Sequence, residues 1–243
     1  QQVTDYVRDG MGRADKLDGK RKNTVGFALT VLQRRLASSP AAIHESLKRR
    51  IARLTKRAHD IEHGIRPDDT LLSASQLDDE EWSSEDIEEA EEEVVDAATS
   101  ALTVEELRLE IAELNDLSAL AARVRATGQD GKWTELRTIL EDNLLHDADD
   151  RARKLIIFTE HRDTLDYLVA QVRSLLGRPD AVEAMHGGVR RPERRRIAEE
   201  FSKNPVCRVL VATDAAGEGL NLQEAHLMVN YDLPWNPNRI EQR

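Results

Sequence analysis

Small and polar residues that suit phosphate binding follow an apolar run near the C-terminal end of the sequence. Thr213 and Asp214 close the run that begins at Cys207, and Gly217 and Gly219 follow within a few residues. Hydroxyl groups and glycine backbone N–H groups can approach an anion closely. These residue types at this spacing predict an anion site, and a plain glycine turn is the alternative interpretation.

Three further polar residues stand at or just past the ends of other apolar runs. Thr159 ends one such run, His186 follows a second, and Asp232 follows a third. Ligands of a doubly wound sheet bind at the carboxyl ends of its strands. If the runs form one parallel sheet, these residues therefore meet at a single edge.

The C-terminal part of the chain alternates between strand and helix patterns. Short apolar runs predict strands over residues 154–159, 181–185, 207–213 and 227–231. Helical patterns lie between them over residues 163–176 and 192–202. Alternation at intervals of roughly 10–15 residues is typical of an α/β domain with a parallel sheet. We therefore predict an α/β fold, with a parallel-sheet lobe that a mainly helical region precedes.

The earlier part of the chain predicts helices. Ser39 and Pro40 can begin one helix as its N-cap and first residue. A capping box between Thr103 and Glu106 begins a second helix, which extends to Gly128. Apolar residues recur at spacings of three and four along both, at Leu47, Ile51, Leu54, Ala58 and Ile61 and at Leu107, Ile111, Leu114, Leu117, Ala121 and Val124. We expect these two apolar seams to pack against each other.

Charge is distributed unevenly along the chain, whose formal net charge is −11. Residues 1–66 hold 15 basic and 7 acidic side chains, whereas residues 67–116 hold 19 acidic ones and Arg108 as their one base. This asymmetry predicts separate roles for the blocks, with a nucleic-acid surface at one end of the chain. A solvated linker is the ordinary interpretation of the acidic run, and a nucleic-acid mimic or a partner-docking segment is the alternative.

These patterns divide the chain into four predicted regions. They are a basic helical region over residues 1–66, an acidic linker or insert over 67–102, a second helical region over 103–150 and the α/β lobe over 151–243. The sequence contains no run of about 18 apolar residues, so it predicts no membrane span. Cys207 is the only cysteine and no leader opens the sequence, so we expect a cytoplasmic protein without disulfides.

Two rival site patterns have weaker support. His59, Glu62 and His63 match the His-x-x-Glu-His pattern of inverted zinc peptidases, but no third ligand is apparent near them. Gly217 and Gly219 lack the third glycine of a dinucleotide fingerprint and follow a late strand. We therefore expect neither a metal site nor a dinucleotide site.

Four stretches in order resemble the second RecA-like lobe of a superfamily 2 helicase, most nearly the Swi/Snf-type branch and its bacterial RapA-like relatives. The stretches are residues 154–165, residues 186–188 with Arg194 and Phe201, residues 213–222, and residues 232–237 continuing to Glu241, Gln242 and Arg243. Residues 1–7 and 32–54 also resemble the segment that joins the two lobes in such proteins.

The resemblance implies an ATP-dependent DNA helicase or translocase that uses ATP and Mg²⁺ in its full-length form. Its partners would be duplex DNA, bound without sequence preference, and an N-terminal RecA-like lobe. The residues on the nucleic-acid side would be Thr159, His186, Gly187, Arg194, Thr213 and Asp214. Those on the nucleotide side would be Gly217, Gly219, Asn221 and Gln242. A solvated basic face is the alternative for Arg194, which stands among four other arginines.

The sequence lacks parts of an ATPase. No Gly-x-x-x-x-Gly-Lys-Ser/Thr loop occurs, and no carboxylate pair ends an apolar strand. The family's arginine fingers would lie beyond Arg243, so no catalytic residue is assigned and we expect the chain alone to be inactive. A nucleoid-associated location is expected. The alternative function is a non-catalytic module that binds a nucleoprotein or polymerase through its helical and acidic segments.

Overall fold

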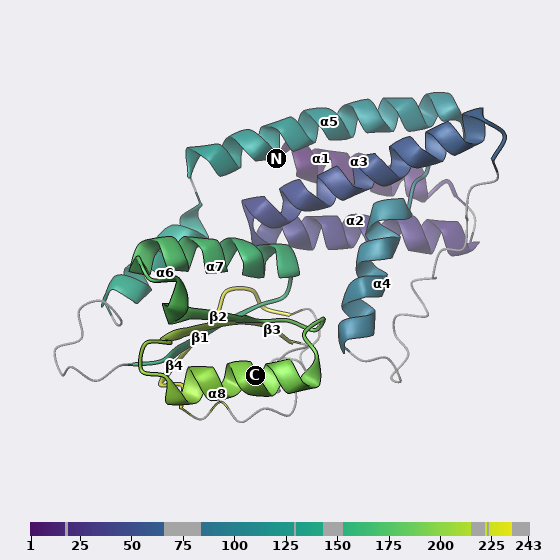
Figure 1. Ribbon diagram of the computed structural model, residues 1–243. Helices are drawn as coiled ribbons and strands as arrows, with labels where there is room; N and C mark the ends of the chain where they lie inside the picture. The colour runs from purple at the N-terminus through teal and green to yellow at the C-terminus, as the bar shows by residue number, and fades with distance from the viewer. Residues whose placement is uncertain are drawn as a thin grey trace. The chain divides into compact units, whose positions relative to one another are not determined.

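The computed structural model describes residues 1–17, 19–65, 84–128, 130–142, 153–214, 222 and 224–234. These residues form two compact units, Gln1–Gln129 and Asp130–Arg243, which are described in turn (Figure 1). Within the described ranges no helix is both long enough and apolar enough to cross a membrane.

The first unit is built from helices throughout its described residues. They are α1 (Gln2–Ala14), α2 (Gly19–Ser38), α3 (Pro40–Glu62), α4 (Ser84–Ala97) and α5 (Val104–Thr127). The Ser39 side chain accepts a hydrogen bond from the Ala42 backbone N–H at 3.0 Å, with proline at the start of α3. The predicted cap of α3 is therefore confirmed.

Helix α5 begins and ends as its sequence predicts. Thr103 accepts a hydrogen bond from the backbone of Glu106, whose carboxylate accepts one from the Thr103 backbone in return. Gly128 ends the helix in the left-handed conformation, with φ of +64°, which glycine adopts without steric cost.

Helices α3 and α5 pack against each other through their apolar seams, as predicted. Leu47 and Leu54 of α3 are buried in one cluster with Leu107 and Leu114 of α5. The seams are shorter than their spacing indicates, because Ile61 and Val124 lie at helix ends and are 37% and 40% exposed.

A buried polar network joins α1, α3 and α5. The Arg50 guanidinium donates to the Val95 carbonyl at 2.6 Å and to Glu110 Oε1 at 2.7 Å. Tyr6 and Thr99 also donate to the Glu110 carboxylate. Burial opposes the charge of Glu110, but Arg50 and these hydrogen bonds hold its pKa below the usual range. Burial raises the pKa of Tyr6 to about 12.

Helix α4, from the acidic run, packs on the basic helices. Three arginines of α2 and α3 face its carboxylates in the ion pairs Arg34–Glu91 at 3.8 Å, Arg49–Glu92 at 2.6 Å, Arg49–Asp96 at 3.5 Å and Arg53–Glu93 at 3.8 Å. Ala90, Val94 and Val95 of the same helix are buried. The interpretation of a solvated linker therefore does not hold for residues 90–97, because their apolar side chains enter the core while their carboxylates neutralise arginines.

The second unit is an α/β lobe. Its elements are α6 (Gly131–Leu140), β1 (Leu155–Thr159), α7 (Arg162–Leu176), the short 3-10 helix Pro179–Ala181, β2 (Val182–Met185), α8 (Arg191–Lys203), β3 (Val209–Thr213) and β4 (Leu227–Asn230). The strands pair in parallel in the order β2-β3-β1-β4. Figure 1 shows α7 on one face of the sheet and α8 on the other. The predicted α/β fold with a parallel-sheet lobe is confirmed.

Alternate residues of the central strands enter two separate cores. Leu155, Ile157 and Val211 pack with α6 and α7, whereas Phe158 and Leu210 pack with α8. Burial on both faces explains why β1 and β3 are continuous apolar runs rather than alternating ones.

Lys154, directly before β1, is a buried lysine at the amino edge of the sheet. Its ammonium donates to the carbonyls of Phe201, Asn204 and Cys207 around the end of α8. Burial lowers the pKa of Lys154 below its usual range. The side chain thus satisfies the Phe201 carbonyl in the last turn of α8 and two carbonyls of the loop that follows the helix.

Candidate functional site

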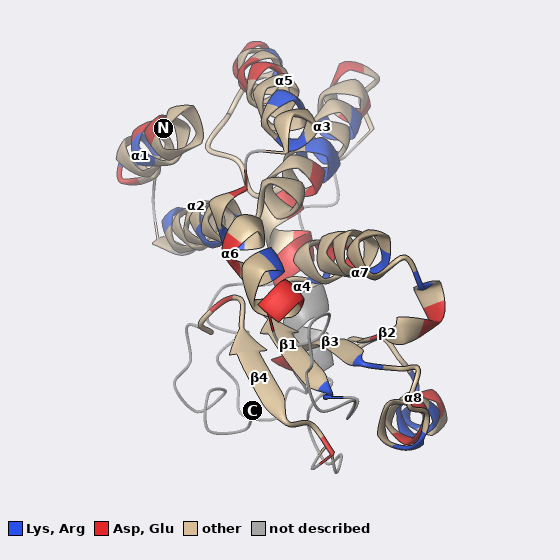
Figure 2. Cartoon of the chain, turned by 90° about the vertical axis from the view of Figure 1, so that its left-hand side faces the viewer, with Lys and Arg blue, Asp and Glu red and all other residues tan. Residues whose placement is uncertain are grey.

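The carboxyl ends of the strands meet at one edge of the sheet. Thr159 at the end of β1 pairs in register with Thr213 at the end of β3. Met185 pairs with Ala212, so His186 comes next to the same edge, and Asp232 follows β4 on the other side of β1. The sequence prediction that these four residues converge is confirmed. Figure 2 shows that the strands themselves carry little charge.

The Thr159 side chain is buried at this edge of the sheet and is hydrogen-bonded to Asp232. Its hydroxyl is fully buried and donates to Asp232 Oδ2 at 2.6 Å. The other carboxylate oxygen of Asp232 accepts from Lys132 Nζ at 2.5 Å. The hydrogen of the Thr159 hydroxyl is therefore already used in this pair.

Asp130 connects the start of helix α6 to Tyr167 and Tyr231, close to the Thr159–Asp232 pair. Its carboxylate caps the helix by accepting from the Trp133 backbone N–H at 3.2 Å. It also accepts from the hydroxyls of Tyr167 at 3.1 Å and Tyr231 at 3.3 Å. Burial, with Asp130 nearby, raises the pKa of Tyr231 well above its ordinary value. Lys132 Nζ lies 4.2 Å from the centre of the Tyr231 ring, so α6 holds its lysine in a fixed place.

Thr213 ends β3 with a buried hydroxyl. The residue is 1% exposed, and its Oγ1 has no hydrogen-bond partner among the described residues. Buried polar side chains are almost always paired, so an exception at a strand end indicates a group kept for a ligand. Asp214 follows it and is also buried.

The turn after β2 is held by Arg194. The guanidinium donates to the carbonyls of Gly187 and Val189, both at 2.6 Å. The backbone N–H of Val189 donates to the His186 carbonyl at 3.0 Å. Arg194 thus shapes the turn that carries His186 and Gly187.

His186 is half-buried and uncharged near neutral pH. Burial lowers its pKa, the charge of Arg162 lowers it further, and Asp166 acts in the opposite direction. With a pKa below its ordinary value, the imidazole is neutral at pH 7 and can donate from one ring nitrogen while accepting at the other.

Sequence reasoning missed Lys132 and Asp130. They lie on a helix that begins more than twenty residues before β1, where no strand-end pattern points to them. An N-cap aspartate ahead of Gly131 was the available signal for the helix, but not for the contact with Asp232. The predicted nucleotide residues Gly217, Gly219, Asn221 and Gln242 lie outside the described residues.

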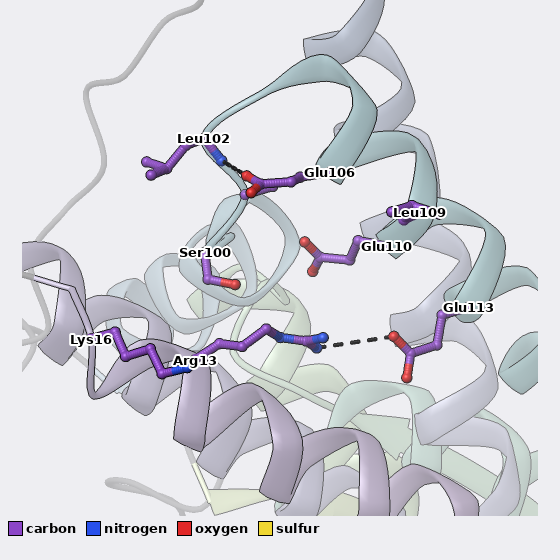
Figure 3. A pocket seen from close by; sticks show the side chains of 9 residues that line it. Arg13, Lys16, Ser100, Leu102, Glu106, Leu109, Glu110 and Glu113 are labelled. Atoms are coloured by element: carbon purple, nitrogen blue, oxygen red, sulfur yellow. Dashed lines mark hydrogen bonds and ion pairs between the residues drawn. The ribbon is translucent and has the colours of Figure 1, made fainter.

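The first unit holds a surface hollow of about 260 Å³, shown in Figure 3. Arg13 and Lys16 lie on one side of it, with Glu106 and Glu113 on the other, and Arg13 is 3.9 Å from Glu113. Glu106 already serves the capping box of α5. A hollow with both signs of charge and with acids already engaged does not favour an anion.

The His59–His63 pattern has ordinary helix-end contacts. The two rings lie 4.0 Å apart, and His63 Nδ1 is 2.8 Å from the His59 carbonyl. Glu62 accepts from Arg108 at 2.6 Å. Among the described residues no group of three or more His, Cys, Asp or Glu side chains is placed to hold a metal ion.

Comparisons with known proteins agree with this architecture. Residues 132–243 match the family model described as "Helicase conserved C-terminal domain". The "Uncharacterized ATP-dependent helicase YqhH" of Bacillus subtilis is 37% identical over 129 residues, which are 52% of this chain and 20% of that protein. The "ATP-dependent RNA helicase dbp8" of Neosartorya fischeri is 37% identical over 100 residues, 41% of this chain and 18% of that protein. The chain thus spans about a fifth of the length of these curated relatives.

A solved structure supports the fold. The helicase domain of Hef from Pyrococcus furiosus superposes with a TM-score of 0.50 at 18% identity, covering 91% of this chain and 36% of that one. The family match spans nearly the whole of the second unit, whose parallel sheet is consistent with a RecA-like lobe.

Proposed function

We propose that the second unit acts as the second motor lobe of an ATP-dependent DNA helicase or translocase of the Swi/Snf-like branch. The observation that carries the proposal is the buried Thr213 hydroxyl, which has no partner among the described residues at the strand end where a ligand is expected. The resemblance of residues 213–222 and 232–237 to that branch supports the choice of DNA.

The groups at this edge fit phosphate oxygens. The Thr213 hydroxyl can donate to one, and a neutral His186 on the turn that Arg194 holds can donate to another. Hydroxyl and imidazole contacts to phosphates position a strand without identifying its bases. We therefore propose binding that is independent of sequence, as a motor that moves along DNA requires.

ATP with Mg²⁺ is the cofactor that the proposal requires. The described residues alone do not supply a site for it, because they hold no metal-binding group of three or more candidate ligands, and the predicted nucleotide residues lie outside them. We propose that ATP binds only where a lobe with a phosphate loop closes on this one, so the chain by itself does not hydrolyse ATP.

Thr213→Val tests the proposal directly. Valine has the shape of threonine, and the hydroxyl it removes makes no hydrogen bond to a described residue, so the variant should melt at or above the temperature of the unmodified chain. Its affinity for a fluorescent DNA duplex should nevertheless fall about fivefold or more, because a phosphate contact is lost.

Thr138→Val is the matched control. Thr138 is an exposed threonine on α6 whose hydroxyl donates to the Thr134 carbonyl, so its loss should leave DNA affinity within about twofold. Single-stranded DNA and an RNA duplex of the same sequence distinguish the nucleic acids. Equal affinity of the Thr213→Val and Thr138→Val variants for all three probes would contradict the proposed edge.

A further inference from the structure

An acidic side chain lies close to the groups proposed to bind phosphate. Asp232 accepts from Thr159, which pairs in register with Thr213 on the next strand. Because neighbouring strands lie about 4.8 Å apart and the Thr159–Asp232 hydrogen bond is 2.6 Å long, the Asp232 carboxylate is roughly 7–8 Å from the Thr213 hydroxyl and roughly 10 Å from a phosphate bound to that hydroxyl. A charge that is 9% exposed at that distance is poorly screened and would repel a phosphate.

Lys132 supplies the compensating charge. Its ammonium contacts the Asp232 carboxylate at 2.5 Å and lies over the Tyr231 ring at 4.2 Å. Its helix is fixed to the sheet by Asp130, which binds the hydroxyls of Tyr167 and Tyr231. The Lys132 side chain is 40% exposed, so its charge also contributes to the electrostatic potential at the surface of this edge.

We propose that Lys132 is a positioning residue for phosphate binding, because it neutralises Asp232 and so keeps the carboxyl edge attractive to a nucleic-acid phosphate. The inference rests on the function proposed above and assigns a role to a residue outside the strand-end motifs. At about 10 Å and an effective dielectric constant of about 20, an uncompensated charge changes phosphate affinity on the order of tenfold, and salt reduces this effect.

The experiment measures the dissociation constant of a fluorescent DNA duplex for variants of the whole chain. Lys132→Met should weaken binding about fivefold, and Asp232→Asn should strengthen it about twofold or more. The double variant should return to within about twofold of the unmodified chain. Lys132→Arg keeps the charge and should also stay within about twofold. All of these differences should shrink as salt is raised from about 50 to 300 mM.

Lys203→Met is the matched control. Lys203 ends α8 just before β3, at the amino edge of the sheet, where it pairs with Glu199 at 3.5 Å. Removing it changes the net charge of the chain by the same amount but far from the proposed site. Its affinity should stay within about twofold of the unmodified chain.

A bridge with a purely structural role predicts a different order. Both single variants would then weaken DNA binding, and the double variant would weaken it at least as much, which would overturn the proposal. Circular dichroism shows whether Lys132→Met folds. If it does not fold, the Asp232→Asn variant tests the proposal, since weaker DNA binding by that variant contradicts the electrostatic role. Absence of DNA binding by the unmodified chain would instead overturn the proposed function. Binding that Lys132→Met and Lys203→Met leave equal would overturn this inference alone.

Discussion

The two units contain similar polar side chains but use them differently. In the first unit, four arginines of α2 and α3 are paired with carboxylates of α4 and α5, namely Arg34, Arg49, Arg50 and Arg53. In the second unit the strand ends gather polar groups at one edge and leave the Thr213 hydroxyl without a partner among the described residues. Polar side chains that pair with one another inside the protein have a structural role, whereas a buried hydroxyl without a partner among the described residues at a strand end indicates a ligand site.

The free energies of the contacts made by α4 support a structural role for the arginines of the first unit. Burial of Val94 and Val95 stabilises the docking of α4 by about 3–5 kcal/mol, whereas each partly exposed ion pair contributes about 0–1 kcal/mol. A nucleic acid that competed for the arginines would have to expose both valines. Three arginines of the basic block, Arg34, Arg49 and Arg53, therefore face the protein's own acidic helix.

The largest effect is expected from Arg50→Met. The variant leaves the Glu110 carboxylate buried without its cation, which should destabilise the first unit by about 3–5 kcal/mol in urea unfolding. Arg53→Met removes a partly exposed ion pair and serves as the control, with an expected loss of at most about 1 kcal/mol. Equal losses for the two variants would show that the Arg50 network is not the structural centre of this unit.

A smaller effect is expected from pH acting on Asp96. Burial raises its pKa to about 6 in the folded chain, although Arg49 and Arg35 oppose the shift. A carboxyl group with a raised pKa binds its proton more tightly when folded, so its contribution to stability increases as pH falls from about 7 to 5. Asp96→Asn should therefore be more stable than the unmodified chain at pH 7 by roughly 2 kcal/mol.

At still lower pH, titration of Glu110 changes the stability of the first unit in the direction opposite to titration of Asp96. Glu110 has a lowered pKa, so its contribution to stability is present above its ordinary pKa and is lost as pH falls below it. Chemical unfolding between pH 7 and 5 should show stability rising in the unmodified chain and remaining flatter in Asp96→Asn. Identical pH profiles would mean that Asp96 does not titrate in this window.

The smallest effect is expected for DNA binding by variants of the α4-facing arginines. Arg49 and Arg53 are engaged with Glu92, Asp96 and Glu93, so Arg49→Gln together with Arg53→Gln should change duplex affinity less than about twofold. Fluorescence anisotropy at one salt concentration measures this directly. A loss as large as that of Thr213→Val would remove the distinction between the units.

Much of the fold was predictable because its signals are local. Caps at Ser39 and Thr103, the glycine stop at Gly128 and the uninterrupted apolar runs of β1 and β3 each depend on neighbouring residues. The convergence of the strand ends also followed, because it is a property of any parallel sheet.

What was missed depends on contacts between distant segments. The Lys132–Asp232 pair joins residues one hundred positions apart, and nothing in either local sequence indicates it. The contacts of Arg194 with the Val189 and Gly187 carbonyls were also not indicated by the local sequence. The net charge of each block likewise did not reveal that the acidic run packs on the basic helices.

Hydrogen exchange of the whole chain with and without a DNA duplex tests the central claim most directly. We predict slower exchange at the strand ends and the turns after them, around residues 159–162, 186–189 and 213–214, and unchanged exchange in α2, α3 and α4. Protection of the three helices with no change at the strand ends would contradict the claim, since it would place DNA on the surface that α4 covers.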